Sequence, residues 1–459
     1  MSFVCRRLIS RSQKWLKHSV QLVYSEQRNK GSLSCQFSSL SYIWGAGDGG
    51  QLGTGTQEHS IVPIKFPVPR EVSHVGCGYG FTVAAEANSC SLWTTGLNSL
   101  SQLGRQPSCS NGPVELGPAT IDLNTTPSTR VQQISCGRSH SAILLDNGEV
   151  LTCGGHFHGQ CGVGNMDTRS IQQFTNIPSI VDNIKQIACG LDHTLLLSYD
   201  GKVVSCGWGV DGQTGLGHYK DEATFKLIEG ELKDVRIKQV ATSADCCLAL
   251  SDEGEVFCWG NNEYGQLATE SDEEQSPKRA SSTEESTRDC TREWLQSGSF
   301  CVLFLLVTGE LYSWGYGVLG HGQEVSFSKS PRKIQEFSCI DETATRVFCG
   351  TDSSAVINRF VAQFSNSGTL YTWGMGSFGR LGLGSNQDQW IPRKVELPGD
   401  VIEYPAALIT WQPCLSAVNI SPEFVTRHVT QHKRVGKPDA SVTSHYINQR
   451  GQDPKFDSL

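Results

Sequence analysis

The sequence predicts an all-β fold, a seven-bladed β-propeller closed by N- and C-terminal strands that share a blade. Three observations support this prediction. A Gly-rich segment recurs seven times along the 459 residues, a second short motif precedes most copies at a nearly constant distance, and the residues between the two motifs alternate between apolar and polar. A long period with roughly four short strands per unit is typical of a propeller.

The N-terminal segment has a composition of its own. Residues 1–41 contain seven bases and one acid, Glu26, with many Ser and apolar residues between them; the bases are Arg6, Arg7, Arg11, Lys14, Lys17, Arg28 and Lys30. A net charge of +6 here, in a chain of −8, leaves −14 for the remainder. An acid-poor, Arg-containing leader predicts a mitochondrial targeting presequence. A disordered basic tail is the alternative.

The first repeated motif is a strand-like segment that ends in Gly and continues into a Gly-rich turn. Its copies are WGAGDGGQLG (44–53), TGLNSLSQLG (95–104), CGGHFHGQCG (153–162), CGWGVDGQTG (206–215), WGNNEYGQLA (259–268), WGYGVLGHG (314–322) and WGMGSFGRLG (373–382). The glycines that mark the copies are Gly45, Gly96, Gly154, Gly207, Gly260, Gly315 and Gly374, at steps of 51, 58, 53, 53, 55 and 59 residues. Each step is long enough for one propeller blade.

The second motif comes before the later markers. It reads CGYGF (77–81), CGRSH (136–140), CGLDH (189–193), TSADC (242–246), SGSFC (297–301) and CGTDS (349–353). Its second residue lies 17 or 18 residues before the next marker in five copies and 24 in the last, and we place that extra length near Asn358 to Gln363. Gly turns between alternating segments, as in ILLDNGEVLTCG and LLSYDGKVVSCG, predict β-hairpins between the two motifs.

Four copies of the first motif spell GxGxxG, which is also the pattern of a dinucleotide-binding turn. A dinucleotide site needs one such turn at the start of a helix, with an acid about 20 residues later. Four copies without a following helical period do not fit that role. We therefore interpret the marker glycines as structural, at positions of positive φ or close backbone approach.

Residues 42–420 are predicted to form the propeller, and closure accounts for the two ends of this range. The repeats begin with a single strand, Tyr42 to Gly45, and end in a weak strand pair around Ala406 to Ile420, which together would complete one blade. Residues 269–293, with eight acids and four bases, are interpreted as a mobile acidic loop. A docking element is the alternative. Residues 421–459 are expected to be a polar tail.

Neither a metal nor a cofactor is predicted. The 18 cysteines form no CxxC pair and are interpreted mostly as small buried side chains. The nearest approach to a metal signature is His156, His158 and Cys161, but a structural zinc site normally needs four ligands. The longest apolar run, Cys301 to Val307, is well short of the roughly 20 residues of a transmembrane helix.

The paired motifs, CG..H followed 17 residues later by WG....GQLG, resemble the regulator of chromosome condensation repeat family, whose members form seven-bladed propellers. Within that family, residues 205–220, 240–250 and 314–320 are similar to a mitochondrial member. The resemblance implies a guanine nucleotide exchange factor that docks a mitochondrial dynamin-related GTPase involved in membrane fusion, either in the matrix or peripheral to the inner membrane. It also implies an alternative, a scaffold in a protein and RNA module with RNA-modifying proteins that maintains the large mitochondrial ribosomal RNA and mitochondrial translation.

In exchange-active relatives, acids and histidines of the loop after CG face the partner, so the resemblance implies partner-binding roles at the matching positions. These positions are His140, Asp192, His193, Asp245 and Asp352. The structural alternative is that a recurring polar residue hydrogen-bonds a neighbouring blade. No GxSxG, P-loop or HExxH motif is present, so the sequence supports no bond-making enzyme.

Overall fold

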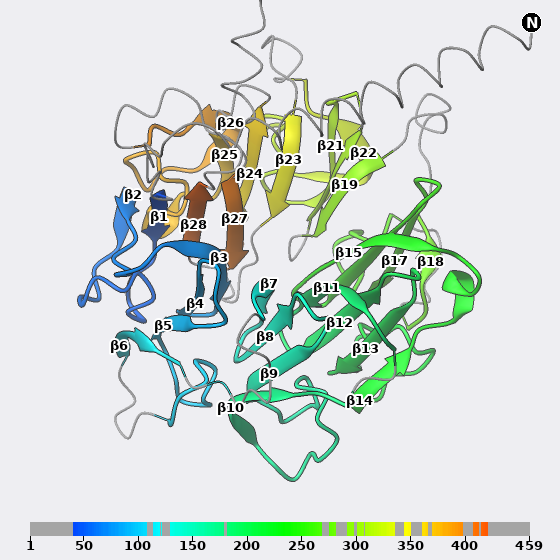
Figure 1. The fold of residues 1–459 in the computed structure, drawn as a ribbon. Helices are drawn as coiled ribbons and strands as arrows, with labels where there is room; N and C mark the ends of the chain where they lie inside the picture. Colours follow the sequence, from blue (N-terminus) through cyan, green and yellow to red (C-terminus); the bar gives the residue numbers. More distant parts are fainter. Residues whose placement is uncertain are drawn as a thin grey trace, which may run out of the picture. The chain divides into compact units, whose positions relative to one another are not determined.

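The computed structural model describes residues 40–107, 113–119, 121, 129–178, 181–268, 275–280, 292–297, 301–306, 308–335, 344–349, 360–365, 370–397, 407–412 and 415–420. These residues form seven four-stranded antiparallel sheets (Figure 1). The all-β class is confirmed. The predicted presequence and polar tail lie outside the described residues, except that the first strand begins at Leu40.

We number the sheets along the chain and give the strands of each in spatial order. Sheet 1 contains β2 (Ser60–Lys65), β1 (Leu40–Gly45), β28 (Leu415–Ile420) and β27 (Ala407–Gln412). Sheet 2 contains β3 (Val72–Gly78), β4 (Phe81–Glu86), β5 (Leu92–Gly96) and β6 (Val114–Pro118). Sheet 3 contains β7 (Val131–Cys136), β8 (His140–Leu145), β9 (Val150–Gly155) and β10 (Ser170–Asn176). Sheet 4 contains β11 (Ile184–Cys189), β12 (His193–Ser198), β13 (Val203–Gly207) and β14 (Glu222–Leu227).

The strands of the remaining three sheets follow one another in chain order, as in sheets 2 to 4. Sheet 5 contains β15 (Ile237–Ser243), β16 (Cys246–Ser251), β17 (Val256–Gly260) and β18 (Lys278–Arg279). Sheet 6 contains β19 (Arg292–Ser297), β20 (Cys301–Leu306), β21 (Leu311–Tyr316) and β22 (Phe327–Lys333). Sheet 7 contains β23 (Ala344–Cys349), β24 (Phe360–Ser365), β25 (Leu370–Gly374) and β26 (Gln389–Lys394). Two short 3₁₀ segments, η1 (Gly230–Leu232) and η4 (Ser377–Gly379), lie in connections.

The two middle strands of each repeat are joined by the hairpins that the Gly turns predicted. Gly148, Gly201, Gly254 and Gly309 lie in these turns with φ between 84° and 87°. Positive φ is a conformation that glycine adopts without steric cost. The hairpins fix the register, and both faces of the middle strands are buried. In β12, Leu195 and Leu197 pack toward sheet 5, whereas Leu196 packs toward sheet 3.

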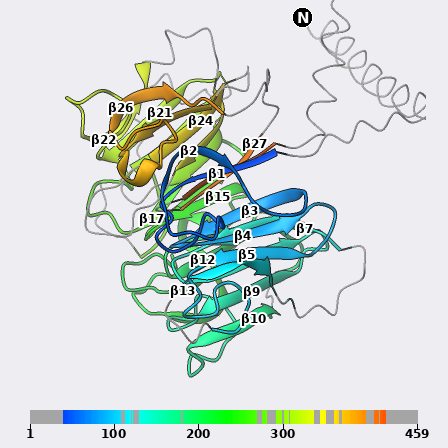
Figure 2. The same cartoon turned by 90° about the vertical axis from the view of Figure 1, so that its left-hand side faces the viewer.

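Sheet 1 joins the two ends of the described chain. β1 pairs with β28 along its whole length, from Leu40 opposite Ile420 to Gly45 opposite Leu415. Figure 1 shows β1, in blue, beside β28, with β27 next in the sheet, and Figure 2 labels β1 and β27 close together. The expected strand pair near residues 406–420 is thus present as β27 and β28, and it shares a sheet with the first strand.

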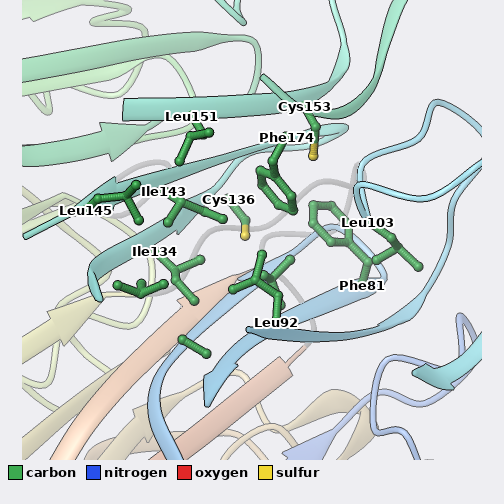
Figure 3. Close-up of a cluster of buried hydrophobic side chains, with 13 residues drawn as sticks. Phe81, Leu92, Leu103, Ile134, Cys136, Ile143, Leu145, Leu151, Cys153 and Phe174 are labelled. Carbon is green, nitrogen blue, oxygen red and sulfur yellow. The ribbon is translucent and has the colours of Figure 1, made fainter. Parts of the chain in front are cut away.

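Neighbouring sheets pack through apolar cores. Figure 3 shows the core between sheets 2 and 3, where Phe81 and Leu92 meet Ile143 and Phe174. Similar clusters connect sheet 1 with 2, and 3 with 4, 4 with 5, 5 with 6 and 6 with 7. Burying aromatic and aliphatic side chains between faces of two sheets is the main stabilising contribution in such a fold.

Sheets 7 and 1 meet through the Trp of the first repeated motif. Trp44 is fully buried, and its Nε1 donates to the carbonyl of Arg380 at 3.1 Å. The same bond recurs at Trp259 to Gln213, 3.1 Å, and at Trp314 to Gln266, 2.9 Å. The motif is therefore an inter-sheet clamp: a Trp of one sheet contacts the Gly-rich turn of the preceding sheet.

Two sequence interpretations need correction. Residues 275–280, within the range interpreted as a mobile loop, are ordered: Lys278 and Arg279 form β18 opposite Cys258 and Phe257. Residue Arg292 also starts β19. A short polar outer strand has no apolar alternation, which is why the composition alone pointed to a loop.

The second correction concerns the extra length before the seventh marker. Phe360 to Gln363, where the extra residues were expected, belong to β24 and pair with β25. The lengthening falls between β23, which ends at Cys349, and β24. In the described residues, no helix combines the length and apolar character needed to span a membrane.

Candidate partner-binding site

The second motif forms the turns between the first and second strands of successive sheets, which we call the CG loops. They comprise residues 79–80, 137–139, 190–192 and 244–245 in sheets 2 to 5. Adjacent loops are bonded through their backbones: Tyr79 N to Gly137 O at 3.4 Å, Arg138 N to Leu191 O at 2.9 Å, and Leu191 N to Ala244 O at 3.1 Å. The four loops therefore form one continuous polar surface at the same end of the sheets.

His140 and His193 do not face this surface. Both are fully buried, at 0% exposure. Thr194 Oγ1 donates to the Gln160 carbonyl, so the Nε2–H of His140 donates to Thr194 Oγ1 at 3.0 Å. His193 bonds Thr242 in the next sheet in the same way, at 2.8 Å. The buried histidines thus connect successive sheets, as the structural alternative predicted.

Burial lowers the pKa of each histidine to about 3, and for His140 the neighbouring His193 adds to the effect. Both rings are therefore neutral at physiological pH. Their Nδ1 atoms are buried and have no hydrogen-bond partner among the described residues. A fully buried, neutral ring cannot contact a docked protein without a rearrangement of the loop.

Asp192 lies on the CG-loop surface and is already paired. It is 4% exposed, Arg138 of the preceding loop forms an ion pair with its Oδ2, and Gln160 Nε2 donates to its Oδ1 at 3.3 Å. The Arg138 side chain is 47% exposed. A partner reaching this position meets the guanidinium as well as the carboxylate, so Arg138 is a surface residue that the motif comparison did not single out.

Asp245 occupies the matching position one sheet further, with no matching cation, because Leu191 stands where Arg138 does. Gln213 Nε2 donates to its Oδ1 at 3.1 Å. Burial and the nearby Asp211 carboxylate raise the pKa of Asp245 to about 6, against opposing effects of Gln213 and Arg138. Its negative charge is therefore less well compensated than that of Asp192, which Arg138 pairs, so a partner's cation would have more effect at Asp245.

Asp352, the remaining predicted site residue, lies outside the described residues. Beside the acids, the CG-loop surface borders two exposed apolar side chains that sequence reasoning missed. Phe157 and Val210 stand at the same position of successive Gly-rich turns and are 42% and 53% exposed. Their shared repeat position was the only signal, and it was ambiguous, because Val318 at the same position of the sixth copy is buried in the core between sheets 6 and 7.

The marker glycines confirm their structural interpretation. All seven have positive φ, from 90° at Gly260 to 126° at Gly374. A Cβ at Gly154 or Gly207 would overlap the backbone carbonyl of Ser139 or Asp192 in the adjacent CG loop. The glycines thus let the two motifs approach each other, and none of them opens a helix as a dinucleotide site would require.

The three residues considered as metal ligands have other partners. His156 Nδ1 accepts from the Cys161 amide at 3.3 Å, and His158 Nδ1 lies 2.9 Å from Asp221 Oδ2. Burial raises the pKa of the Cys161 thiol well above its usual range, so it stays protonated. Among the described residues, no group of three potential ligands is arranged to hold a metal.

The periodic motif pair, the four-stranded sheets and the inter-sheet Trp contacts are typical of one family. Comparison of the sequence with known protein families identifies that family. Residues 41–409 match the RCC1-like domain family. The chain belongs to the RCC1-like domain family. A human relative named RCC1-like G exchanging factor-like protein is 35% identical over 368 residues, which cover 74% of this chain and 75% of the relative. The secretion-regulating guanine nucleotide exchange factor of Bos taurus is 28% identical over 393 residues, 77% of this chain and 78% of that protein.

Solved RCC1-like structures have the same fold. The crystal structure of human WBSCR16 superimposes with a TM-score of 0.74 at 31% identity and covers 84% of this chain and 99% of that chain. Prp20p from Saccharomyces cerevisiae gives a TM-score of 0.70 at 21% identity, covering 87% and 96%, which is a likeness of fold. The resemblance inferred from the repeated motifs is confirmed.

Proposed function

We propose that the seven sheets close into a seven-bladed ring and that the CG-loop surface of this ring docks a GTPase and accelerates release of its guanine nucleotide. Membership of the RCC1-like family, which includes a relative named as an exchange factor, supports the general activity. The poorly compensated Asp245, beside Arg138 and exposed Val210, is the observation that supports this surface.

Docking would exchange one set of contacts for another without any covalent step. A partner's Lys or Arg opposite Asp245 and Asp211 would gain a charge-assisted contact, and an apolar side chain could cover Val210. An exchange factor acts by binding the nucleotide-weak conformation of the GTPase more tightly than the nucleotide-bound one. A stiff surface, bonded loop to loop, suits that role because it does not adapt to the wrong conformation.

The proposed substrate is a mitochondrial dynamin-related GTPase that acts in membrane fusion, with the chain in the matrix or peripheral to the inner membrane. The basic, acid-poor composition of residues 1–41 supports a mitochondrial location. The similarity of residues 205–220 to a mitochondrial family member agrees with it. No bond-making chemistry and no cofactor are part of this proposal.

Release of a fluorescent GDP from that GTPase, with and without the purified chain, tests the proposal. We expect acceleration, reduced about tenfold by Asp245→Asn, which keeps the shape and the Gln213 contact but removes the charge. The same variant should be more stable at pH 7, because it removes a carboxylate that burial disfavours. Lys226→Glu on β14 is the control and should exchange normally.

Two results would refute the exchange proposal. One is a release rate that the wild-type chain does not change. The other is an equal loss of acceleration in Lys226→Glu and Asp245→Asn, which would place the docking surface elsewhere.

A second candidate function is a scaffold in a module that maintains the large mitochondrial ribosomal RNA together with RNA-modifying proteins. The observation that favours it is an asymmetric charge distribution along the outer strands, described next. Crosslinking to that RNA in mitochondria, with no effect on GDP release, would favour the scaffold over the exchange factor.

A further inference from the structure

The outer strand of each sheet is β2 in sheet 1 and β6, β10, β14, β18, β22 and β26 in sheets 2 to 7. These outer strands differ sharply in charge. Those of sheets 5, 6 and 7 contain seven cations and no acid; they are Lys278, Arg279, Lys329, Arg332, Lys333, Arg393 and Lys394. Those of sheets 2, 3 and 4 contain one cation, Lys226, and two acids, Glu115 and Glu222. These three basic strands are consecutive, and we call them the basic rim. This concentration of positive charge occurs in a chain whose overall net charge is −8.

Local acids compensate only part of the basic rim. Four of the seven cations have an acidic partner: Arg279 pairs with Glu255 at 2.9 Å, Lys333 with Glu310 at 2.5 Å, Lys394 with Glu396 at 3.5 Å and Lys278 with Glu231 at 3.9 Å. Lys329, Arg332 and Arg393 are exposed and have no carboxylate partner among the described residues. Exposed ion pairs contribute little, so the paired cations also remain available to a strong polyanion.

Aromatic side chains accompany the cations on sheet 6. The rings of Tyr264 and Tyr316 are stacked, with centroids 5.6 Å apart. Phe327, which starts β22 opposite Tyr316, is 46% exposed. A Cβ at Gly265, next to Tyr264, would lie 3.6 Å from the Phe327 ring and 3.8 Å from Lys329 Cγ. Two tyrosines, a phenylalanine and a lysine therefore form one contiguous patch.

The basic rim continues from this patch along β22. Lys329, Arg332 and Lys333 follow Phe327 on one strand. Phe327 and Lys333 lie opposite Tyr316 and Tyr312, four residue steps apart, which at about 3.3 Å per step give about 13 Å. Of the three rings, Phe327 is exposed and the two tyrosines are half-buried. Cations beside accessible aromatic rings are the combination that binds single-stranded nucleic acid, because phosphates follow the cations while bases stack on the rings. An acidic peptide or an anionic bilayer would use the cations but not a stacked aromatic pair.

We propose that the basic rim, with Tyr264, Tyr316 and Phe327, is a binding surface for single-stranded RNA. None of its residues belongs to the CG loops, so RNA binding and nucleotide exchange are assigned to different side chains. The inference gives the second candidate function a site, and it stands or falls independently of exchange, since GDP release does not enter its test.

The test uses the full chain and a fluorescein-labelled oligouridine of about 20 nucleotides, followed by anisotropy between about 50 and 200 mM KCl. The rim variant is Lys329→Glu with Arg332→Glu. The matched control is Lys220→Glu with Lys226→Glu, the same change of charge on and beside β14. Residues 1–41 are present in every variant, so their basic charge contributes equally.

We expect the rim variant to weaken binding at least about tenfold and to lower the slope of log K against log salt by about 1.4, two phosphate contacts at about 0.7 each. Phe327→Ala with Tyr264→Ala should also weaken binding about tenfold with an unchanged slope, since stacking carries no charge. The control should bind as the wild type does. Circular dichroism melts establish that each variant is folded.

Several outcomes would overturn the proposal: no binding by the wild type, equal losses in the rim variant and the control, or full binding by the folded aromatic variant. Tighter binding to duplex RNA of the same length would also contradict it. If polyglutamate or phosphatidylserine vesicles bind in a rim-dependent way and oligouridine does not, the basic rim serves an acidic protein or a membrane instead.

Discussion

The second and fifth residues of the second motif pack against each other. Gly137 and Gly190 lie under the rings of His140 and His193, and a Cβ on either glycine would overlap the ring. In sheet 5 the same two positions hold Ser243 and Cys246, both buried. Where the glycine is lost, the large ring is lost with it. The motif therefore records a packing requirement, which accounts for the buried positions of His140 and His193.

A double-mutant cycle in sheet 4 tests this coupling. Gly190→Ser alone should destabilise the protein by about 1 to 3 kcal/mol, because the side chain is forced against the His193 ring and the Ala244 carbonyl. Adding His193→Cys reproduces the sheet 5 pair and should recover at least about 1 kcal/mol relative to the sum of the single changes. Urea unfolding measures the cycle; strict additivity would show that the two positions are independent.

Acid stability provides a second test at this scale. The pKa of His140 and of His193 is lowered to about 3 by burial, against an ordinary value of 6.5. The unfolded chain therefore binds more protons between pH 6.5 and 3, and stability must fall as the pH falls through that range. Near pH 4.5 each histidine should cost about 2 to 3 kcal/mol relative to pH 7.

The comparison that isolates the histidines is wild type against His140→Gln with His193→Gln, unfolded in urea at several pH values. The difference in stability between the two proteins should shrink toward acid pH. Asp245, with its raised pKa, acts in the opposite sense between pH 4 and 6 but is present in both proteins and cancels. A difference that stays constant with pH would contradict buried neutral rings.

At the scale of the elements, the sequence predicted inner strands well and outer strands poorly. The middle strands are short, mostly apolar and buried, and they meet at Gly turns, as β12 and β13 do around Gly201. The outer strands contact a neighbour on one edge only, so they need no apolar alternation, and β18 was interpreted as loop. The basic rim could not be predicted either, because only the sheet order places those strands in equivalent positions.

Proline and cations protect these outer edges. β2, β22 and β26 contain Pro63, Pro331 and Pro392, each followed within two residues by Lys. An open edge of a sheet can pair with another chain, and both residue types oppose such pairing. We expect Pro392→Val with Lys394→Val to increase aggregation, measured by light scattering at equal concentration. Thr224→Val with Lys226→Val on β14 is the comparison, and a larger increase there would contradict this role.

At the scale of the whole molecule, the pairing of β1 with β28 and the Trp44 clamp join the first and last parts of the described fold. Repetition allowed the sequence to predict this pairing, since a lone first strand and a leftover strand pair complete one sheet. Two features could not be predicted from repetition: the strand β18 within residues 269–293, and the position of the extra residues before β24. Both lie in segments whose lengths differ from those of the corresponding segments in the other repeat copies.

Two truncations test how far the fold depends on this junction. Ending the chain after Ile420 should leave the unfolding midpoint nearly unchanged, whereas ending it after residue 406 removes β27 and β28 and should abolish cooperative unfolding. Trp44→Phe should cost about 1 to 2 kcal/mol, as should Trp259→Phe, because each loses the same buried hydrogen bond. Equal damage from the two truncations would contradict a structural role of the junction.

The partnership of β1 with β28 also has a temporal consequence. A polypeptide emerging from a ribosome, or threading through a translocation channel, exposes β1 first and must wait for nearly the whole chain before its partner arrives. Contacts so distant in sequence form late. During that interval the edge of β1 that faces away from β2 is open, so holdase chaperones have their longest opportunity to bind at the very start of the fold. A premature stop codon anywhere upstream of Leu415 leaves that edge permanently unpaired.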